Sequence, residues 1–277
     1  MIPTVKKIIP AIVFILTSVA CERIAFDPGI VTLNEELPVV YAVLGNHPEY
    51  RTIELTRTAP YMDGTEVKTI DNATVTVSDD SRTFVFEHTE NGRYLAPEAF
   101  KPGVDITYYL NIEIDGERYT SQSKMHPPVN LHSLKVQHDR WEDEEDNIYE
   151  ITGWMKDNEI EDERFLLKYT INNVAYDSVQ VWSHYTDQLI NNLWLEDAML
   201  FDDIIAYPND TIDVYVLSVS TEYYDFVQAA EKNRVSSNPF SPPPGVPITG
   251  NISNDALGIF QVSAIVQETV TVPSETQ

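Results

Sequence analysis

The sequence predicts a mainly β protein, and three observations support this fold class. Short segments in which apolar and polar residues alternate recur along the chain, with turn residues between them. Of the 277 residues, 43% are hydrophobic, which is enough for one large or two small folded domains. Helix signals are confined to residues 187–201 and 221–234. We therefore expect two β-rich domains, the second of which contains one or two helices.

The N-terminal domain is expected over residues 36–126. Turn pairs such as Asn91-Gly92, Pro102-Gly103 and Asp115-Gly116 separate its strands, and the last pair has hairpin chemistry because both residues tolerate a positive φ. Six or seven short strands joined in this way are typical of an immunoglobulin-like antiparallel sandwich. The strand-like segments are 37–44, 52–58, 73–78, 83–87 and 106–114.

The second β-rich domain is expected over residues 127–266. Met125-His126-Pro127-Pro128 interrupts the alternation and marks the boundary. Residues 211–220 are apolar on both faces, which predicts a central strand. Residues 267–277 are expected to form a polar tail. The other expected strands of this domain are 131–138, 148–155, 165–171, 174–182 and 257–266.

The clearest helix is predicted over residues 221–234. Ser220 or Thr221 can serve as its N-cap, and acidic residues in the first turns and basic residues in the last match the helix dipole. In residues 187–201 the apolar residues recur at helical spacing, which predicts a short helix or an irregular packed loop.

The net charge limits the partners. With 18 basic and 44 acidic residues, the formal net charge is -26. This charge repels the phosphates of nucleic acids and anionic lipid head groups, so we expect no nucleic-acid partner.

The first twenty residues form a secretion signal. Lys6 and Lys7 precede the apolar run Ile8–Leu16, and small and polar residues follow. The run is shorter than the roughly 20 residues that cross a bilayer as a helix. We therefore expect residues 1–20 to be cleaved and the protein to be exported.

Cys21, the only cysteine, gives a second signal. Ser18-Val19-Ala20-Cys21 resembles the lipobox of bacterial lipoproteins, although Ser18 stands where an aliphatic residue is commoner. The resemblance implies acylation of the Cys21 thiol and of the new amino terminus, and two or three fatty chains hold a protein stably at a membrane. Residues 21–35 would then be a lipidated tether. The alternative is a free thiol after an ordinary signal.

Short motifs in a fixed order resemble a known family. Leu55–Tyr61 and Ala73–Asp79 are similar to the N-terminal motifs of the domain of unknown function 4249, found in Bacteroidota envelope lipoproteins. The resemblance covers about residues 37–266. It implies a lipid-anchored outer-membrane protein, on the periplasmic or cell-surface face, associated with a TonB-dependent β-barrel transporter, and it supplies no catalytic residues. The C-terminal motif residues are Tyr223, Tyr224, Asn238, Pro239, Phe240, Asn251, Ser253, Asn254, Gly258 and Phe260.

The search for catalytic chemistry predicts no catalytic residue, cofactor or metal site. Common hydrolase, zinc and phosphate-loop motifs are missing, and the six histidines form no ligand-like pair on a predicted helix. A glycosidase pair of carboxylates stays open, because the fold and not the spacing sets such a pair.

An acidic stretch over residues 139–163 is interpreted as a solvated loop. It holds twelve acidic residues against Arg140 and Lys156. The weaker alternative is a calcium site with Asp143, Glu145 and Asp146 as ligands, although the glycine and the ligand spacing of an EF-hand loop are missing.

The tryptophans Trp141, Trp154, Trp182 and Trp194 all lie in the second half of the chain. Most are expected in the core, and any that are exposed would suit stacking on a sugar ring or an apolar partner.

Three functions follow as hypotheses. The first is a non-enzymatic, lipid-anchored binding or accessory protein of the outer envelope. The second is an envelope hydrolase acting on glycan or peptide, which requires a pocket with convergent carboxylates. The third is a structural or adhesive surface module.

Overall fold

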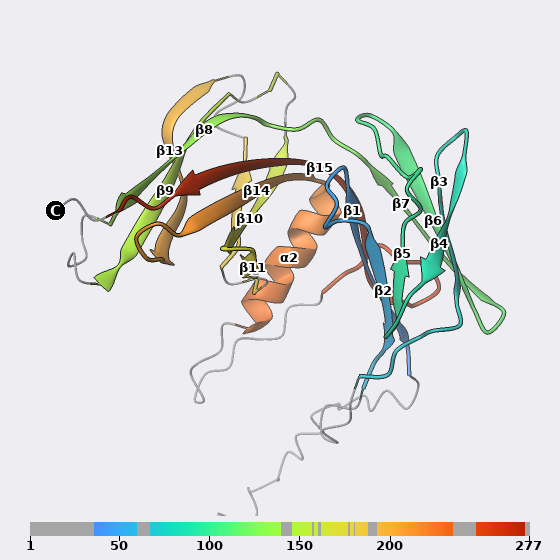
Figure 1. Ribbon diagram of the computed structural model, residues 1–277. Coiled ribbons are helices and arrows are strands. Elements are labelled where there is room, and N and C mark those ends of the chain that lie inside the picture. Colours follow the sequence, from blue (N-terminus) through green and yellow to red (C-terminus); the bar gives the residue numbers. More distant parts are fainter. Residues whose placement is uncertain are drawn as a thin grey trace, which may run out of the picture. The chain divides into compact units, whose positions relative to one another are not determined.

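The computed structural model describes the main part of the chain (Figure 1). Residues 36–277 cluster into one compact unit. The signal, Cys21 with its tether, Asp143, Glu145, Asn238, Pro239 and Phe240 lie outside the described residues. The described ranges are 36–59, 67–139, 146–156, 158–159, 162–176, 178–179, 181–187, 193–234 and 248–274. Within these ranges the protein is mainly β, as predicted, and α2 is the one helix.

The N-terminal region forms the expected antiparallel sandwich. One layer contains β1 (Pro38–Gly45), β2 (Thr52–Arg57) and β5 (Arg93–Leu95). The other contains β3 (Thr74–Ser78), β6 (Thr107–Ile114) and β7 (Glu117–Lys124). β4 (Thr83–His88) pairs first with β3 and then with β5, so it passes from one layer to the other. A core of alternating inward residues fills the sandwich, including Tyr94, Phe100 and Tyr108.

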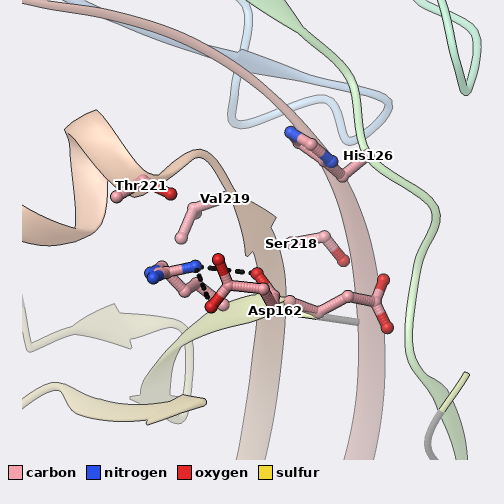
Figure 2. Close-up of a pocket in the computed structure, with 7 residues that line it drawn as sticks. His126, Asp162, Ser218, Val219 and Thr221 are labelled. Carbon is pink, nitrogen blue, oxygen red and sulfur yellow. Dashed lines mark hydrogen bonds and ion pairs between the residues drawn. The ribbon is translucent and has the colours of Figure 1, made fainter. Parts of the chain in front are cut away.

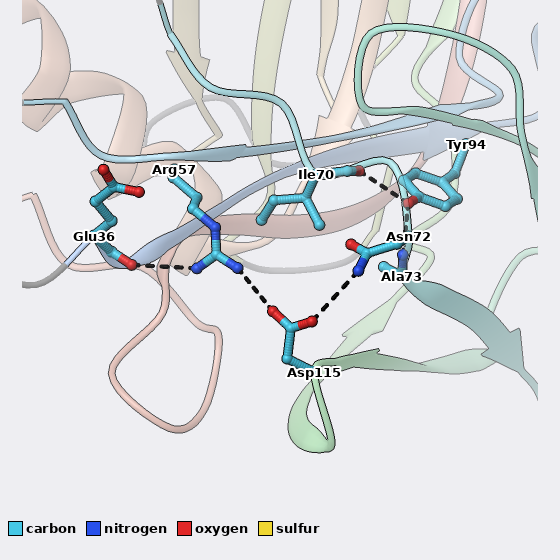
Figure 3. Close-up of polar contacts among 7 residues, drawn as sticks. All are labelled: Glu36, Arg57, Ile70, Asn72, Ala73, Tyr94 and Asp115. Carbon is cyan, nitrogen blue, oxygen red and sulfur yellow. Dashed lines mark hydrogen bonds and ion pairs between the residues drawn. The ribbon is translucent and has the colours of Figure 1, made fainter.

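Polar contacts fix the turn between β6 and β7 (Figure 3). Asp115 and Gly116 both have positive φ, as the hairpin prediction requires. The Asp115 carboxylate accepts a hydrogen bond from Arg57 at 3.1 Å and from the Asn72 amide at 3.3 Å. The turn is thereby tied to β2 and to the segment that leads into β3.

β15 (Leu257–Thr271) joins the two regions of the chain. Its first half pairs in parallel with β1, from Val39 with Leu257 to Gly45 with Ser263. Its second half pairs antiparallel with β14 (Thr211–Val219), and Figure 1 shows it as one long strand. The sheet therefore continues from the sandwich into the second region. The polar tail expected from residue 267 is wrong for residues 267–271, because these residues continue β15, with exposed and half-buried side chains in alternation, and remain paired with β14.

The second region packs two sheets against each other. β10 (Arg164–Ile171), β11 (Val174–Ala175) and β12 (Ser183–Thr186) extend the large sheet beyond β14. β8 (Asn130–His138), β9 (Ile148–Lys156) and β13 (Trp194–Ile205) form a separate three-stranded sheet. A second core lies between them. β14 is buried along most of its length and lies between β10 and β15, as its two apolar faces predicted.

Two expectations for the second region are wrong. The described residues from Trp194 onward in segment 187–201 form β13 and no helix. Of the strand expected over residues 174–182, the described residues form only β11, which follows a turn at residues 172–173 and pairs with the end of β10. The chain pairs with β10 again from Ser183.

The predicted helix is confirmed as α2 (Thr221–Arg234). Of the two possible N-caps, the structure uses Ser220: its Oγ accepts the Tyr223 N–H at 3.2 Å. The apolar face of α2 packs on β1, β10, β14 and β15 through a third core that contains Tyr223, Tyr224 and Val227.

Candidate polar binding site

His126 lies between two hollow spaces in the surface. It follows β7, and the proline pair after it leads into β8. An inner cavity of about 100 Å³ and an outer groove of about 460 Å³ both have His126 in their walls. The segment that the sequence marked as a boundary therefore supplies the residue that the two spaces share.

The inner cavity is lined by the start of β10, the end of β14 and the start of α2 (Figure 2). Arg164 donates to the Asp162 carbonyl at 2.7 Å and forms an ion pair with its carboxylate at 3.1 Å. Ser218 is only 2% exposed, and its Oγ has no hydrogen-bond partner among the described residues. Glu163 and Thr221 complete the polar wall.

The outer groove follows β7 and the start of α2. Hydroxyl and amide side chains form most of its wall, and Lys124 and Glu222 add one charge of each sign. The Oγ of Ser121 is buried and has no partner among the described residues. The uncharged polar residues of the wall are Thr107, Ser121, Gln122, Ser123, Ser220 and Asn251.

Burial lowers the pKa of His126 from its ordinary value of 6.5, and the positive charge of Lys124 lowers it further. Asp105 and Glu222 oppose this shift more weakly. The imidazole is therefore neutral at pH 7, so one ring nitrogen donates a hydrogen bond and the other accepts one.

The arrangement suits the binding of a small polar molecule. Charged groups of both signs line the inner cavity. Each space has one buried hydroxyl without a partner among the described residues, Ser218 in the cavity and Ser121 in the groove. Buried polar groups in native proteins are nearly always hydrogen-bonded, so each exception calls for an explanation.

The C-terminal motif residues act on the fold beside this site. The Asn251 amide pairs with the backbone of Phe260 through two hydrogen bonds of 2.8 Å, as a neighbouring strand would. Ser253 donates its N–H to the Thr120 carbonyl at 2.9 Å and accepts the Thr120 N–H on its Oγ at 2.7 Å. These bonds close the gap between β7 and β15, and Asn251 reaches the groove wall.

The remaining described motif residues also have structural contacts. Asn254 donates to Glu117 at 3.0 Å. Tyr223 is fully buried under α2, and burial raises its pKa well above the ordinary value. Gly258 has a φ of +105° and lies against the Val40 backbone. These contacts place the described motif residues at the junction of β1, β7, β15 and α2, where Asn251 also lines the groove.

The acidic stretch is described only in part. Asp146 is exposed at the start of β9, and the other two calcium candidates lie outside the described residues. Within the described ranges, no group of three His, Cys, Asp or Glu side chains is placed to hold a metal ion. No helix in the same ranges is long and apolar enough to span a bilayer.

Sequence reasoning missed the site because its residues are far apart in the chain. His126, Arg164 and Ser218 come from three separate segments, and no spacing rule connects them. One signal was present: Ser218 interrupts the apolar run of a strand expected to be covered on both faces. A hydroxyl in such a position must find a partner or face a cavity.

The fold and the site together define a class of protein: a mainly β protein whose sandwich continues through one shared strand into a second β region, with a polar cavity at the junction. The chain belongs to the family DUF4249, a domain of unknown function, whose model matches residues 24–269. A comparison with curated proteins finds no match.

Solved structures add little to this assignment. The FN1–FN3 domains of chicken CNTN1 match with 13% identity and a TM-score of 0.23. The match covers 66% of this chain and 60% of that one, which is less than two thirds of its length. A likeness this weak carries no argument about either fold or function.

Proposed function

We propose that this protein is a lipid-anchored accessory protein of the outer membrane that binds a small polar ligand at the His126 site and serves a TonB-dependent β-barrel transporter. The observation that supports ligand binding is the pair of buried, unpartnered hydroxyls, Ser121 Oγ and Ser218 Oγ, on the groove and the cavity that share His126. The resemblance of Ser18-Val19-Ala20-Cys21 to a lipobox supports the anchor.

The energetics favour a ligand with several hydrogen-bonding groups. A buried polar group without a partner costs about 1–3 kcal/mol, and a ligand that satisfies it recovers part of this cost on binding. Asp162 and Glu163 favour an amino group, whereas Arg164 and Lys124 favour a carboxylate. Free amino acids and short peptides carry both groups and are the first compounds to test.

A thermal-shift screen of the purified full chain with amino acids and dipeptides tests the site. We expect at least one compound to raise the melting temperature, and Ser218→Ala to weaken its binding at least tenfold, because the alanine removes the hydroxyl and adds no atoms to the buried position. Ser133→Ala, an exposed serine on β8, is the matched control and should leave binding unchanged. Equal binding by the Ser218→Ala variant would contradict this site.

Fractionation tests the anchor. Cys21→Ala should move the protein from the membrane pellet to the soluble fraction, because the fatty chains are lost. An unmodified Cys21 thiol in the intact mass of the exported protein would rule out the anchor.

A pull-down tests the partner. A mild-detergent pull-down through a C-terminal tag should recover a large β-barrel with the wild-type protein.

A second candidate is the hydrolase. A serine hydroxyl, a neutral imidazole and a carboxylate line the same cavity, from Ser218, His126 and Glu163. These are the groups of a serine nucleophile, its base and the residue that orients the base. A fluorophosphonate probe should then label the wild type and not Ser218→Ala. Failure to label the folded wild type leaves ligand binding as the function of the cavity.

A further inference from the structure

Three aromatic rings meet on the outer face of the three-stranded sheet. His132 comes from β8, Trp154 from β9 and Trp194 from β13. Ring centroids lie 4.9 Å apart for His132 and Trp194, 5.3 Å for His132 and Trp154, and 5.4 Å for the two tryptophans. His132 stacks on Trp194 with an interplanar angle of 29°, and the other two pairs are tilted, at 37° and 38°. We call these three residues the aromatic cluster.

The aromatic cluster faces water. Trp154 is 45% exposed and Trp194 is 52% exposed. Their chain neighbours Met155 and Leu195 point the other way and pack in the second core. Single exposed aromatic residues are ordinary, but here three strands each contribute a ring to one place. Cross-strand aromatic contact stabilises the sheet, and it still leaves about half of each tryptophan exposed to solvent.

A polar border adjoins the rings along the same strands. Lys135 on β8 forms an ion pair with Asp197 on β13 at 3.8 Å, across the central strand β9. Asn130 donates to the Asn158 amide oxygen at 3.3 Å. The Lys156 ammonium lies 5.8 Å from the ring centroid of Trp194. The cluster is therefore a small apolar surface bordered by amides and by charges of both signs.

We propose that the aromatic cluster is a carbohydrate-binding site that stacks a pyranose ring of a neutral glycan. One face of a pyranose presents C–H groups, which fit an indole face, and its edge carries hydroxyls, which fit the amide, carboxylate and ammonium groups of the border. The mixed charges of the border select neither an anionic nor a cationic ligand. A nucleobase would also stack, but the net charge of -26 repels the phosphates that accompany it.

This site is independent of the His126 site. None of the three rings lines the inner cavity or the outer groove. A glycan can therefore bind whether or not the proposed amino-acid or peptide ligand does, and the two proposals can fail separately.

Affinity electrophoresis and calorimetry of the full chain in mild detergent test the proposal. The probes are hexasaccharides of β-1,4-glucose, β-1,4-N-acetylglucosamine, α-1,4-glucose and α-1,6-mannose. We expect at least one hexasaccharide to bind. Trp154→Ala and Trp194→Ala should each weaken the binding of that hexasaccharide at least tenfold, and His132→Ala should weaken it less. Tyr207→Ala removes a 60% exposed aromatic ring just beyond β13 and is the matched control.

Two results overturn the proposal. The first is that no probe binds the wild type at millimolar concentration, and the second is that both the Trp154→Ala and the Trp194→Ala variants bind as tightly as the wild type. If these variants fail to fold, wild-type indole N–H resonances followed during a glycan titration give the same decision, because at least one of them must shift. Loss of a co-purifying protein from the tryptophan variants, with no glycan bound by the wild type, would assign the cluster to a protein interface instead.

Discussion

Two glycines fix the approach of β15 to its neighbours. A Cβ at Gly258 would lie 1.9 Å from the Val40 carbonyl oxygen, and a Cβ at Gly250 would lie 1.9 Å from the Gly258 carbonyl oxygen. No Cβ fits at these separations. Only glycine, which carries no side-chain carbon, allows the backbone to come this close to its neighbour at either position. The motif that contains Gly258 is thus explained by contact between backbones.

Gly258→Ala should lower the free energy of unfolding by about 2–4 kcal/mol, because positive-φ strain adds to a backbone clash. Gly116→Ala is the matched control: its φ is +87°, but a Cβ there meets nothing within 4 Å. It should lose only about 1–2 kcal/mol. Equal losses in urea unfolding of the two variants would contradict the clash.

The pKa of His126 makes stability depend on pH. Because this pKa is lower in the folded protein than its ordinary value of 6.5, only the unfolded chain binds the proton between the two values. The free energy of unfolding should therefore rise with pH through the window below 6.5 and become flat above it. Urea titrations at several pH values should show a smaller rise for His126→Gln. An unchanged pH slope in that variant would mean that His126 is not buried as described.

At the residue scale, sequence reasoning identified positions without their roles. The family resemblance marked Asn251, Ser253 and Gly258, but only the folded structure shows their roles. Asn251 and Ser253 close the space between β7 and β15, and Gly258 lets β15 approach β1. Ser218 and His126 were not marked as site residues, because a cavity is a property of segments that meet only after folding.

The start of α2 gives a prediction at the scale of the element. Ser220→Ala removes the N-cap hydrogen bond to Tyr223 and should cost about 1 kcal/mol. Thr221→Ala is the control, because the structure does not use Thr221 as the cap, and it should change the free energy of unfolding by less than about 0.5 kcal/mol. Chemical denaturation followed by far-UV circular dichroism measures both. A larger loss in Thr221→Ala would show that the cap is misassigned.

Elements with regular patterns were predicted well, and β13 shows why the others were not. Its register with β9 shifts between Leu195 and Ala198 and again on either side of Phe201. Each bulge adds a residue, so inward positions recur every three residues rather than every two. This spacing imitates a helix, and the sequence pattern alone cannot separate the two.

At the scale of the whole molecule, the shared strand predicts cooperative unfolding. All four tryptophans lie between residues 141 and 194, so tryptophan fluorescence reports on the second region, whereas far-UV circular dichroism reports on both. Because β15 bonds to β1 and to β14, we expect the two signals to change at the same urea concentration. Two separate transitions would mean that the regions unfold independently.

The division of the chain was predicted only in part. Residues up to Met125 supply most of the first core and residues from Val129 onward supply the second, near the boundary inferred from His126 and the prolines. The separation is incomplete, because Phe260 of β15 belongs to the first core and Val43 of β1 belongs to the third. The return of β15 to β1 was not predicted, because its apolar pattern specifies a strand and not its neighbours. Parallel pairing between distant segments leaves no local trace in the sequence.

The pairing of Val39 with Leu257 also sets an order of events during biogenesis. A chain that emerges from the ribosome amino end first delivers β1 early, and the partner for its outer edge, β15, follows only after β2–β14 and α2 have emerged. Until then β1 offers unpaired amides and carbonyls to any passing extended segment. Contacts of such long sequence separation also close slowly. The interval between emergence and closure is when this protein is most exposed to aggregation and proteolysis.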